Sequence, residues 1–177
     1  MKRYISLLVL GLVFSAPAFS AEWGVGVSAR SNDMSVYFPI KASATIRLEP
    51  YVSVYRDENN EGGYTNTSEY LNFGVGVFTV SNIKETTQFY YGARVGYFTF
   101  ESESKNDFEL SKTEGDKYSL APAFGFEYFV TENISLGGEA AWQYVETSAE
   151  VTRGGRKSDW DATSSGTSTR LILRYFY

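Results

Sequence analysis

The chain has 177 residues, with 16 lysines and arginines against 21 aspartates and glutamates, and it contains neither cysteine nor histidine. The acidic balance disfavours binding to nucleic acid, and the lack of cysteine excludes disulfides, thiolate metal sites and a lipid-modified cysteine. Aromatic residues make up 17% of the chain, although its mean hydropathy is slightly polar. A strict alternation of apolar and polar residues gives such a mean hydropathy, because the value of each apolar residue is offset by that of its polar neighbour.

Residues 1–20 predict an export signal. Lys2 and Arg3 precede an apolar run from Ile5 to Phe14, and the small residues around Ser20 suit cleavage after that position. The run is shorter than the roughly 20 residues that a membrane-spanning helix needs, so we expect it to direct export and not to hold the chain in the membrane. We therefore expect a Sec-exported chain with one domain over residues 21–177. Its formal charge would be −7, from 14 basic and 21 acidic residues.

Alternation continues through the rest of the chain and predicts eight strands. They are expected at 22–31, 35–41, 46–57, 68–80, 87–103, 115–130, 134–150 and 165–177. In the last one, Leu171, Leu173, Tyr175 and Tyr177 share one face, while Arg170 and Arg174 stand on the other. This pattern predicts an all-β fold, an eight-stranded antiparallel up-and-down transmembrane β-barrel with apolar rows toward lipid. The alternative, a lipocalin-like soluble barrel with the opposite sidedness, would expose the aromatic rows to water.

The connections between the predicted strands alternate in length. Those at 42–45, 81–86 and 131–133 are short, whereas those at 58–67, 103–114 and 150–164 are longer and hydrophilic; the first connection, at 32–34, is also short. Export leaves the N-terminus in the periplasm, so the longer connections are expected to be extracellular loops. Strands five to seven look longer than a bilayer requires, which predicts that part of the sheet projects beyond the membrane.

Aromatic residues near the strand ends fit the girdles at the two membrane interfaces. They are Trp23, Tyr97, Tyr118, Tyr128, Trp142, Tyr175 and Tyr177. The alternative is a surface that stacks against carbohydrate. The girdle is favoured because these residues are spread over many strands and are not gathered in loops.

Charged residues on the inward face predict an ion-pair network in the lumen. The network would comprise Arg47, Glu49, Arg94, Glu127, Glu139, Arg170 and Arg174. Eight strands leave an interior just wide enough for side chains, and an unpaired buried charge costs several kcal/mol, so we expect the charges to pair and plug the barrel. The alternative is a gated or leaky passage for ions or small solutes.

Several segments resemble the small eight-stranded outer-membrane barrels of the OmpX and OmpA-transmembrane-domain kind. They are 46–51 (IRLEPY), 125–129 (GFEYF), 135–139 (SLGGE) and the aromatic terminus. The resemblance implies a monomer in the bacterial outer membrane, surrounded by lipid and lipopolysaccharide. It also implies escort by periplasmic chaperones and an assembly signal, made of Leu171, Leu173, Tyr175 and Tyr177, that the barrel-assembly machinery reads. The architecture hosts adhesins, resistance proteins, structural barrels and a few enzymes, so it implies no single activity.

Catalysis is disfavoured by the absence of histidine. Enzymes of this architecture that act on lipids or proteins pair a histidine with a hydroxyl or a carboxylate, because a hydroxyl needs a base at neutral pH. Glu127 and Glu139 on neighbouring predicted strands are the remaining candidates for acid–base chemistry. Because both are expected to face arginines, we predict no catalytic residues and no cofactor.

Two loops invite a binding hypothesis. The segment Asp57–Gly62 begins like a calcium loop, but its twelfth position is Ser68 where a bidentate glutamate is required, so no metal site is expected. Weak bridging of lipopolysaccharide by divalent ions remains open there. Arg153, Arg156 and Lys157 form a basic cluster that would contact lipopolysaccharide phosphates, unless the loop is merely soluble.

The sequence therefore predicts a non-enzymatic outer-membrane barrel that acts through envelope integrity or through surface contact and adhesion by its extracellular loops. Trp160 is a candidate contact for a surface partner. The alternative function is a small porin-like channel for ions or small solutes.

Overall fold

The computed structural model of the chain describes residues 22–30, 33–61, 64–105 and 110–177. The strands are β1 (Gly24–Arg30), β2 (Asp33–Tyr37), β3 (Ile40–Lys41), β4 (Ile46–Glu61), β5 (Tyr64–Lys84), β6 (Thr87–Lys105), β7 (Leu110–Phe129), β8 (Ile134–Arg153) and β9 (Arg156–Phe176). No helix among these residues has the length and hydropathy that crossing a bilayer requires. The expected export signal, residues 1–20, lies outside the described residues.

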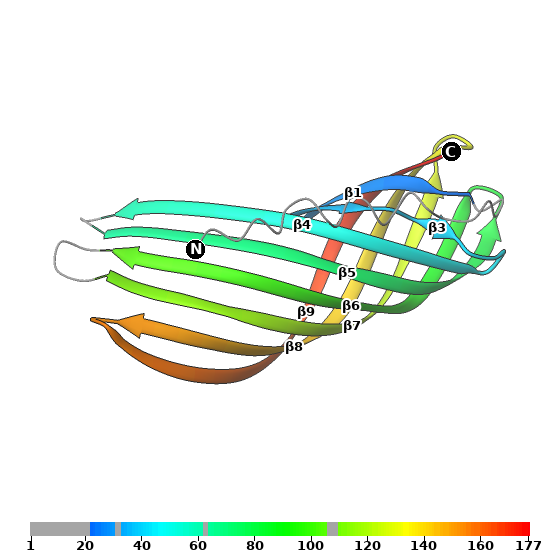
Figure 1. Ribbon diagram of the computed structural model, residues 1–177. Coiled ribbons are helices and arrows are strands. Elements are labelled where there is room, and N and C mark those ends of the chain that lie inside the picture. The colour runs from blue at the N-terminus through cyan, green and yellow to red at the C-terminus, as the bar shows by residue number, and fades with distance from the viewer. Residues whose placement is uncertain (1–21, 31–32, 62–63, 106–109) are drawn as a thin grey trace.

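The strands close into a ring (Figure 1). Consecutive strands from β3 to β9 pair antiparallel, β1 pairs with both β2 and β9, and β2 also pairs with β4. Strands β2 and β3 both lie along β4 and together make the second predicted strand. Pro39 lies between them, and proline has no N–H with which to continue the ladder. The predicted eight-stranded up-and-down barrel is confirmed, with one strand interrupted at this proline.

The alternation of side chains sets the two faces of the barrel wall. Apolar residues of the outward rows are exposed, as Phe124 at 53% and Leu171 at 68% show, whereas Glu49 and Glu127 of the inward rows are completely buried. A soluble barrel would show the reverse arrangement, so that alternative is wrong. The exterior presents apolar side chains that lipid, and not water, solvates favourably.

The hydrophilic connections predicted as long loops are instead mainly strands, so this part of the prediction is wrong. Strands β4 to β9 have between 16 and 21 residues, about twice the 9–11 that crossing a bilayer takes. Between β8 and β9 the only residues outside the strands are Gly154 and Gly155, with φ of 56° and 77°. A two-residue hairpin turn requires this left-handed conformation, which glycine adopts without strain. The connections at the opposite end of the barrel are short, as predicted.

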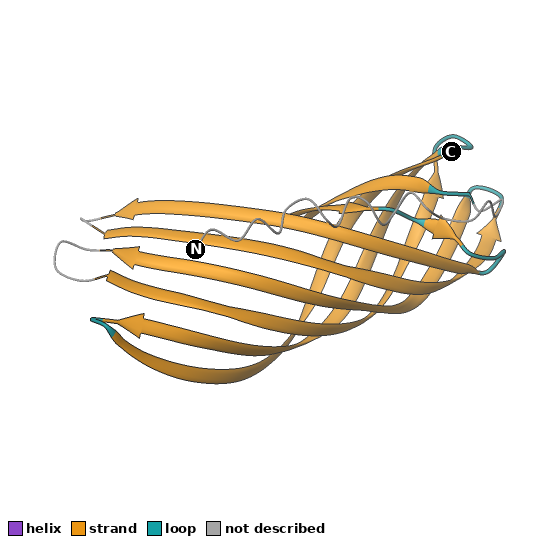
Figure 2. Cartoon of the chain, in the orientation of Figure 1, coloured by secondary structure: helices purple, strands orange, loops and turns teal. Residues whose placement is uncertain are grey.

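The long strands continue beyond the ring as an open sheet (Figure 2). We define the projecting sheet as the residues from the paired row Val54, Leu71, Thr99, Asp116, Ser148 and Asp161 outward to the hairpin ends. Strand β2 pairs with β4 no further than Ser53, and β1 pairs with β9 no further than Leu171. Within the described residues, β4 and β9 therefore form two free edges of this sheet.

Candidate functional site

The lumen is filled by apolar side chains at the end with the short turns. Ile172 is fully buried and Phe176 nearly so, and the Phe129 and Phe176 rings lie 5.8 Å apart. Lys41 extends along this end, with Nζ 5.2 Å from the centre of the Phe176 ring. Lys41, Phe129 and Phe176 are the last residues of their strands, whereas Ile172 lies between Arg170 and Arg174 on the inward face of β9. Phe129 and Phe176 provide apolar packing at this mouth of the barrel.

A network of buried ion pairs occupies the middle of the lumen. Glu49 on β4 is completely buried and contacts three arginines from three strands. Its Oε1 lies 2.9 Å from Arg47 Nε and 2.8 Å from Arg174 Nη2, and its Oε2 lies 2.7 Å from Arg94 Nη2. One carboxylate therefore ties together β4, β6 and β9.

The other two buried carboxylates extend this network around the barrel. Glu127 on β7 is bound by Arg47 and by Arg174, whose Nη1 is 3.1 Å from Oε1, and it accepts a hydrogen bond from Ser135. Glu139 on β8 accepts hydrogen bonds from Arg94 Nε at 2.9 Å and Arg94 Nη2 at 2.7 Å. Arg170 Nε lies 3.3 Å from the same carboxylate. The structure thus brings all seven predicted lumen residues into one set of contacts.

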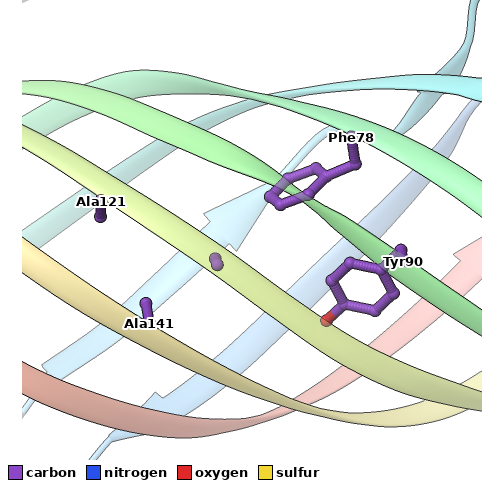
Figure 3. Packing of buried hydrophobic residues seen from close by; sticks show 5 residues of the cluster. Phe78, Tyr90, Ala121 and Ala141 are labelled. Atoms are coloured by element: carbon purple, nitrogen blue, oxygen red, sulfur yellow. The ribbon is translucent and has the colours of Figure 1, made fainter.

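The aromatic residues that support this network were missed by the sequence analysis. The guanidinium of Arg94 lies 4.7 Å from the centre of the Phe78 ring and 4.9 Å from that of Tyr37, and the guanidinium of Arg47 lies 4.6 Å from that of Tyr90. Figure 3 shows the rings of Phe78 and Tyr90 in the barrel interior. Their centroids lie 5.3 Å apart. The inward parity of these aromatic residues was the available signal, but the sequence analysis placed only charged residues in the lumen network. The lumen therefore combines ion pairs with cation–π contacts.

Glycines opposite these rings make the packing possible. A Cβ at Gly125 would lie 2.5 Å from the Tyr90 hydroxyl, and one at Gly96 would lie 2.4 Å from the Tyr51 hydroxyl. Both distances are too short for any side chain. The inward glycines of the sequence therefore provide space for large neighbours and do not mark an empty channel.

A polar cavity of about 110 Å³ lies on the other side of the ion pairs, toward the projecting sheet. Arg94 and Arg170 line it together with amide, hydroxyl and small side chains; the other lining residues are Ser28, Ser35, Tyr51, Asn72, Phe98, Ser119, Ala121 and Gln143. The cavity has room for several water molecules. The lumen thus has three layers: apolar packing, ion pairs and this cavity.

Comparison with known proteins identifies the architecture. No protein-family profile matches the chain, and no curated protein matches its sequence. A major outer membrane protein from Thermus thermophilus superposes with a TM-score of 0.67 at 12% sequence identity, over 90% of this chain and 100% of that one. Ail, the attachment invasion locus protein of Yersinia pestis, superposes with a TM-score of 0.51 at 12% identity, over 88% of this chain and 93% of that one. The chain has the fold of a small bacterial outer-membrane β-barrel.

The outward surface agrees with this location. The aromatic residues predicted to form girdles lie on the outward face, and Trp23 stacks on Tyr177 with ring centroids 4.3 Å apart near the short-turn end. Tyr97 and Tyr118 lie 5.1 Å apart on neighbouring strands, close to the start of the projecting sheet. Rings at two levels bracket the apolar rows, as they do in outer-membrane barrels. The fold and this exterior both indicate the bacterial outer membrane.

The projecting sheet of this outer-membrane barrel has an acidic outer face. Five acidic residues are direct cross-strand neighbours on β5 to β9, and we name them the acidic row: Glu69, Glu101, Glu114, Glu150 and Asp159. Like charges placed directly opposite each other destabilise a sheet. Lys112 relieves part of this repulsion, since its Nζ lies 2.9 Å from Glu101 and 3.2 Å from Glu114.

The inner face of the same sheet is aromatic and largely uncharged. Tyr55, Tyr70 and Phe100 are neighbours on β4, β5 and β6, with ring centroids 5.5 Å and 6.2 Å apart. Lys117 lies beside them, with Nζ 4.6 Å from the centre of the Phe100 ring. Trp160 belongs to the same cross-strand row on the free edge of β9 and is 42% exposed. The two faces of the sheet therefore differ sharply in chemistry.

The predicted loop sites lie at the outer ends of the strands. Arg153 and Arg156 flank the Gly154-Gly155 turn, and Lys157 Nζ lies 2.5 Å from Glu150. This contact raises the pKa of Lys157, chiefly through the hydrogen bond to Glu150. Residues Asp57–Glu61 of the segment that begins like a calcium loop are part of β4 and pair with β5, while Gly62 lies outside the described residues. The basic cluster is thus at a hairpin tip and not in a long loop.

Proposed function

We propose that this chain is a non-enzymatic, monomeric outer-membrane protein whose projecting sheet makes surface contacts, with adhesion as the activity. The extension of six strands beyond the ring carries this proposal, because a barrel that only spanned the bilayer would need about half of their length. The sheet offers a wide face and two free edges to the outside of the cell. Ail shares the fold and is by name an attachment and invasion protein, but the proposal rests on the sheet of this chain.

The free edges are the part of the sheet best suited to a partner. The backbone N–H and C=O groups along an unpaired edge strand can pair with an extended segment of another protein. Residues 156–167 of β9 are exposed on both faces. Arg156 and Lys157 lie on the free edge of β9 together with Asp159 and Asp161, so this edge offers charges of both signs to a partner.

The buried network supports a structural role for the lumen. Glu127 and Glu139 are each held by arginines, which leaves neither carboxylate free for acid–base chemistry. Together with the apolar packing around Phe176, the ion pairs form a continuous plug. We propose that the plug stabilises the barrel and that the protein does not work as a porin.

Shortening one hairpin tests the adhesive role. Deletion of residues 149–153 and 156–160 joins Ser148 to Asp161 through the Gly154-Gly155 turn, and these two residues are already paired across the strands. Cells displaying the shortened protein should lose adhesion to protein-coated surfaces, while the barrel should still show heat-modifiable migration on gels. The matched control replaces Lys84, near a short turn, by glutamine. Undiminished adhesion after all three projecting hairpins are shortened would overturn the proposal.

A further inference from the structure

The cavity above the ion pairs has the composition of a binding site for an anion. Two guanidinium groups, those of Arg94 and Arg170, line it, and none of its described lining residues is acidic. The neutral lining residues add hydrogen-bond donors: the side-chain amides of Asn72 and Gln143 and the hydroxyl of Ser119. An anion in this cavity would meet positive charge and neutral donors together.

The charges around the cavity do not balance. The network joins four arginines to three glutamates, which leaves one positive charge in excess. Arg170 carries this excess because its ion-pair partner, Glu139, already accepts two shorter hydrogen bonds from Arg94. Its side chain is 15% exposed, whereas Arg47, Arg94 and Arg174 are each exposed by 3% or less. The surplus cation therefore stands at the side of the network where the cavity lies.

Arg94 adds positive charge beneath the cavity but no free donor. Its Nε and Nη2 donate to Glu139, and Nη2 also donates to Glu49. Its Nη1 is inaccessible to solvent and therefore does not face the cavity. Arg170 is thus the guanidinium group that an anion in the cavity would contact.

We propose that the cavity binds one small inorganic oxyanion of the phosphate or sulfate type, held chiefly by Arg170, with the positive charge of Arg94 beneath it. Guanidinium groups present paired N–H donors that match the oxygens of such anions better than they match a halide. The cavity, at about 110 Å³, accommodates a tetrahedral oxyanion together with water. Binding would neutralise the excess charge of the lumen and would stabilise the folded barrel.

Titration calorimetry of the full chain, folded into nanodiscs of zwitterionic lipid at constant ionic strength, tests this inference with inorganic phosphate and with sulfate as probes. We expect saturable binding with one site per chain and weaker binding of chloride. Arg170→Gln should weaken phosphate binding at least tenfold. Ser119→Leu should do the same by filling the cavity without changing any charge.

Arg56→Gln is the matched control, because Arg56 pairs with Glu69 on the exposed projecting sheet and its loss removes the same charge. Its affinity for phosphate should equal that of the wild type. Heat-modifiable migration of each variant verifies folding. If Arg170→Gln does not fold, Ser119→Leu still tests the inference, because it retains every charge of the wild type. The inference is overturned if the wild type shows no saturable binding, or if Ser119→Leu binds as tightly as the wild type.

Discussion

Glu49 on β4 and Arg174 on β9 form an ion pair inside the lumen, with 2.8 Å between Glu49 Oε1 and Arg174 Nη2, and both side chains are inaccessible to solvent. The two residues come from strands near the beginning and at the end of the barrel, so their contact forms only when the ring closes. Both strands also contribute to the rest of the network. The ion pairs therefore favour the closed barrel over an open sheet.

Replacing Glu49 by glutamine should reduce the free energy of unfolding by about 3–5 kcal/mol, because it removes one partner from buried ion pairs and leaves guanidinium groups uncompensated. Urea unfolding of the barrel in lipid vesicles, followed by heat-modifiable migration, measures the change. Glu132→Gln, at an exposed short turn, is the matched control and should unfold like the wild type. Equal midpoints for Glu49→Gln and the control would contradict a structural role of the network.

The plugged lumen should carry no steady current. In a planar bilayer we expect the wild-type protein to show no discrete, stable openings, because apolar packing and ion pairs follow one another along the axis. Steady wild-type openings whose size changes when Arg94 or Glu127 is neutralised would instead establish a passage through the network. That result would favour the porin-like function.

The sequence predicts the sidedness of the barrel because, within the bilayer, one face of each strand meets lipid and the other a polar lumen. Residues such as Leu171 and Arg174 therefore reveal their environment by type alone. This contrast vanishes in the projecting sheet, where both faces meet water, and the segments around Thr67 and Glu114 accordingly resemble loops in the sequence. Only the paired register of the strands shows that they are β-structure.

The network residues were predictable for a similar reason, but their partners were not. A charged residue on an inward position has to be buried, which identifies Arg47 and Glu139 without coordinates. Phe78 and Tyr90 suit lipid and lumen equally well by composition. Only the structure shows these rings beside guanidinium groups and beside glycines that leave space for them.

Lys112 should stabilise the projecting sheet by lying between members of the acidic row. Lys112→Gln would leave Glu101 and Glu114 opposite each other, which should cost roughly 0.2–1 kcal/mol and increase amide hydrogen exchange in the outer parts of β6 and β7. The hydrogen bonds that Lys112 donates to both glutamates raise its pKa. The stabilisation is therefore present at neutral pH and is lost as the pH rises through this elevated pKa.

Salt provides the check on this electrostatic origin. The difference in exchange between Lys112→Gln and wild type should shrink as ionic strength rises, because both partners are partly exposed to solvent. Lys84→Gln, which removes a charge near a short turn, should leave exchange in the projecting sheet unchanged. A difference that is independent of salt would mean that Lys112 acts through packing and not through charge.

The basic cluster at the tip of β8 and β9 should help to retain lipopolysaccharide. Substitution of Arg153, Arg156 and Lys157 by glutamine should reduce the lipopolysaccharide that copurifies in mild detergent, because guanidinium and ammonium groups bind its phosphates. Retention equal to wild type in the triple variant would remove the basis for this contact.

The terminal aromatic residue should act as an assembly signal, and its contacts permit a test that separates recognition from packing. Tyr177 stacks on Trp23, and its backbone N–H donates to Trp23 O over 2.9 Å. Tyr177→Ala should lower the amount of folded protein in the outer membrane of cells, but it should fold normally into lipid vesicles without assembly machinery. Trp23→Ala removes the same ring contact yet keeps the outward row of Leu171, Leu173, Tyr175 and Tyr177, so it should assemble normally in cells. If both variants assemble equally poorly in cells and fold equally poorly in vesicles, Tyr177 serves packing at the strand ends and the assembly machinery does not read it.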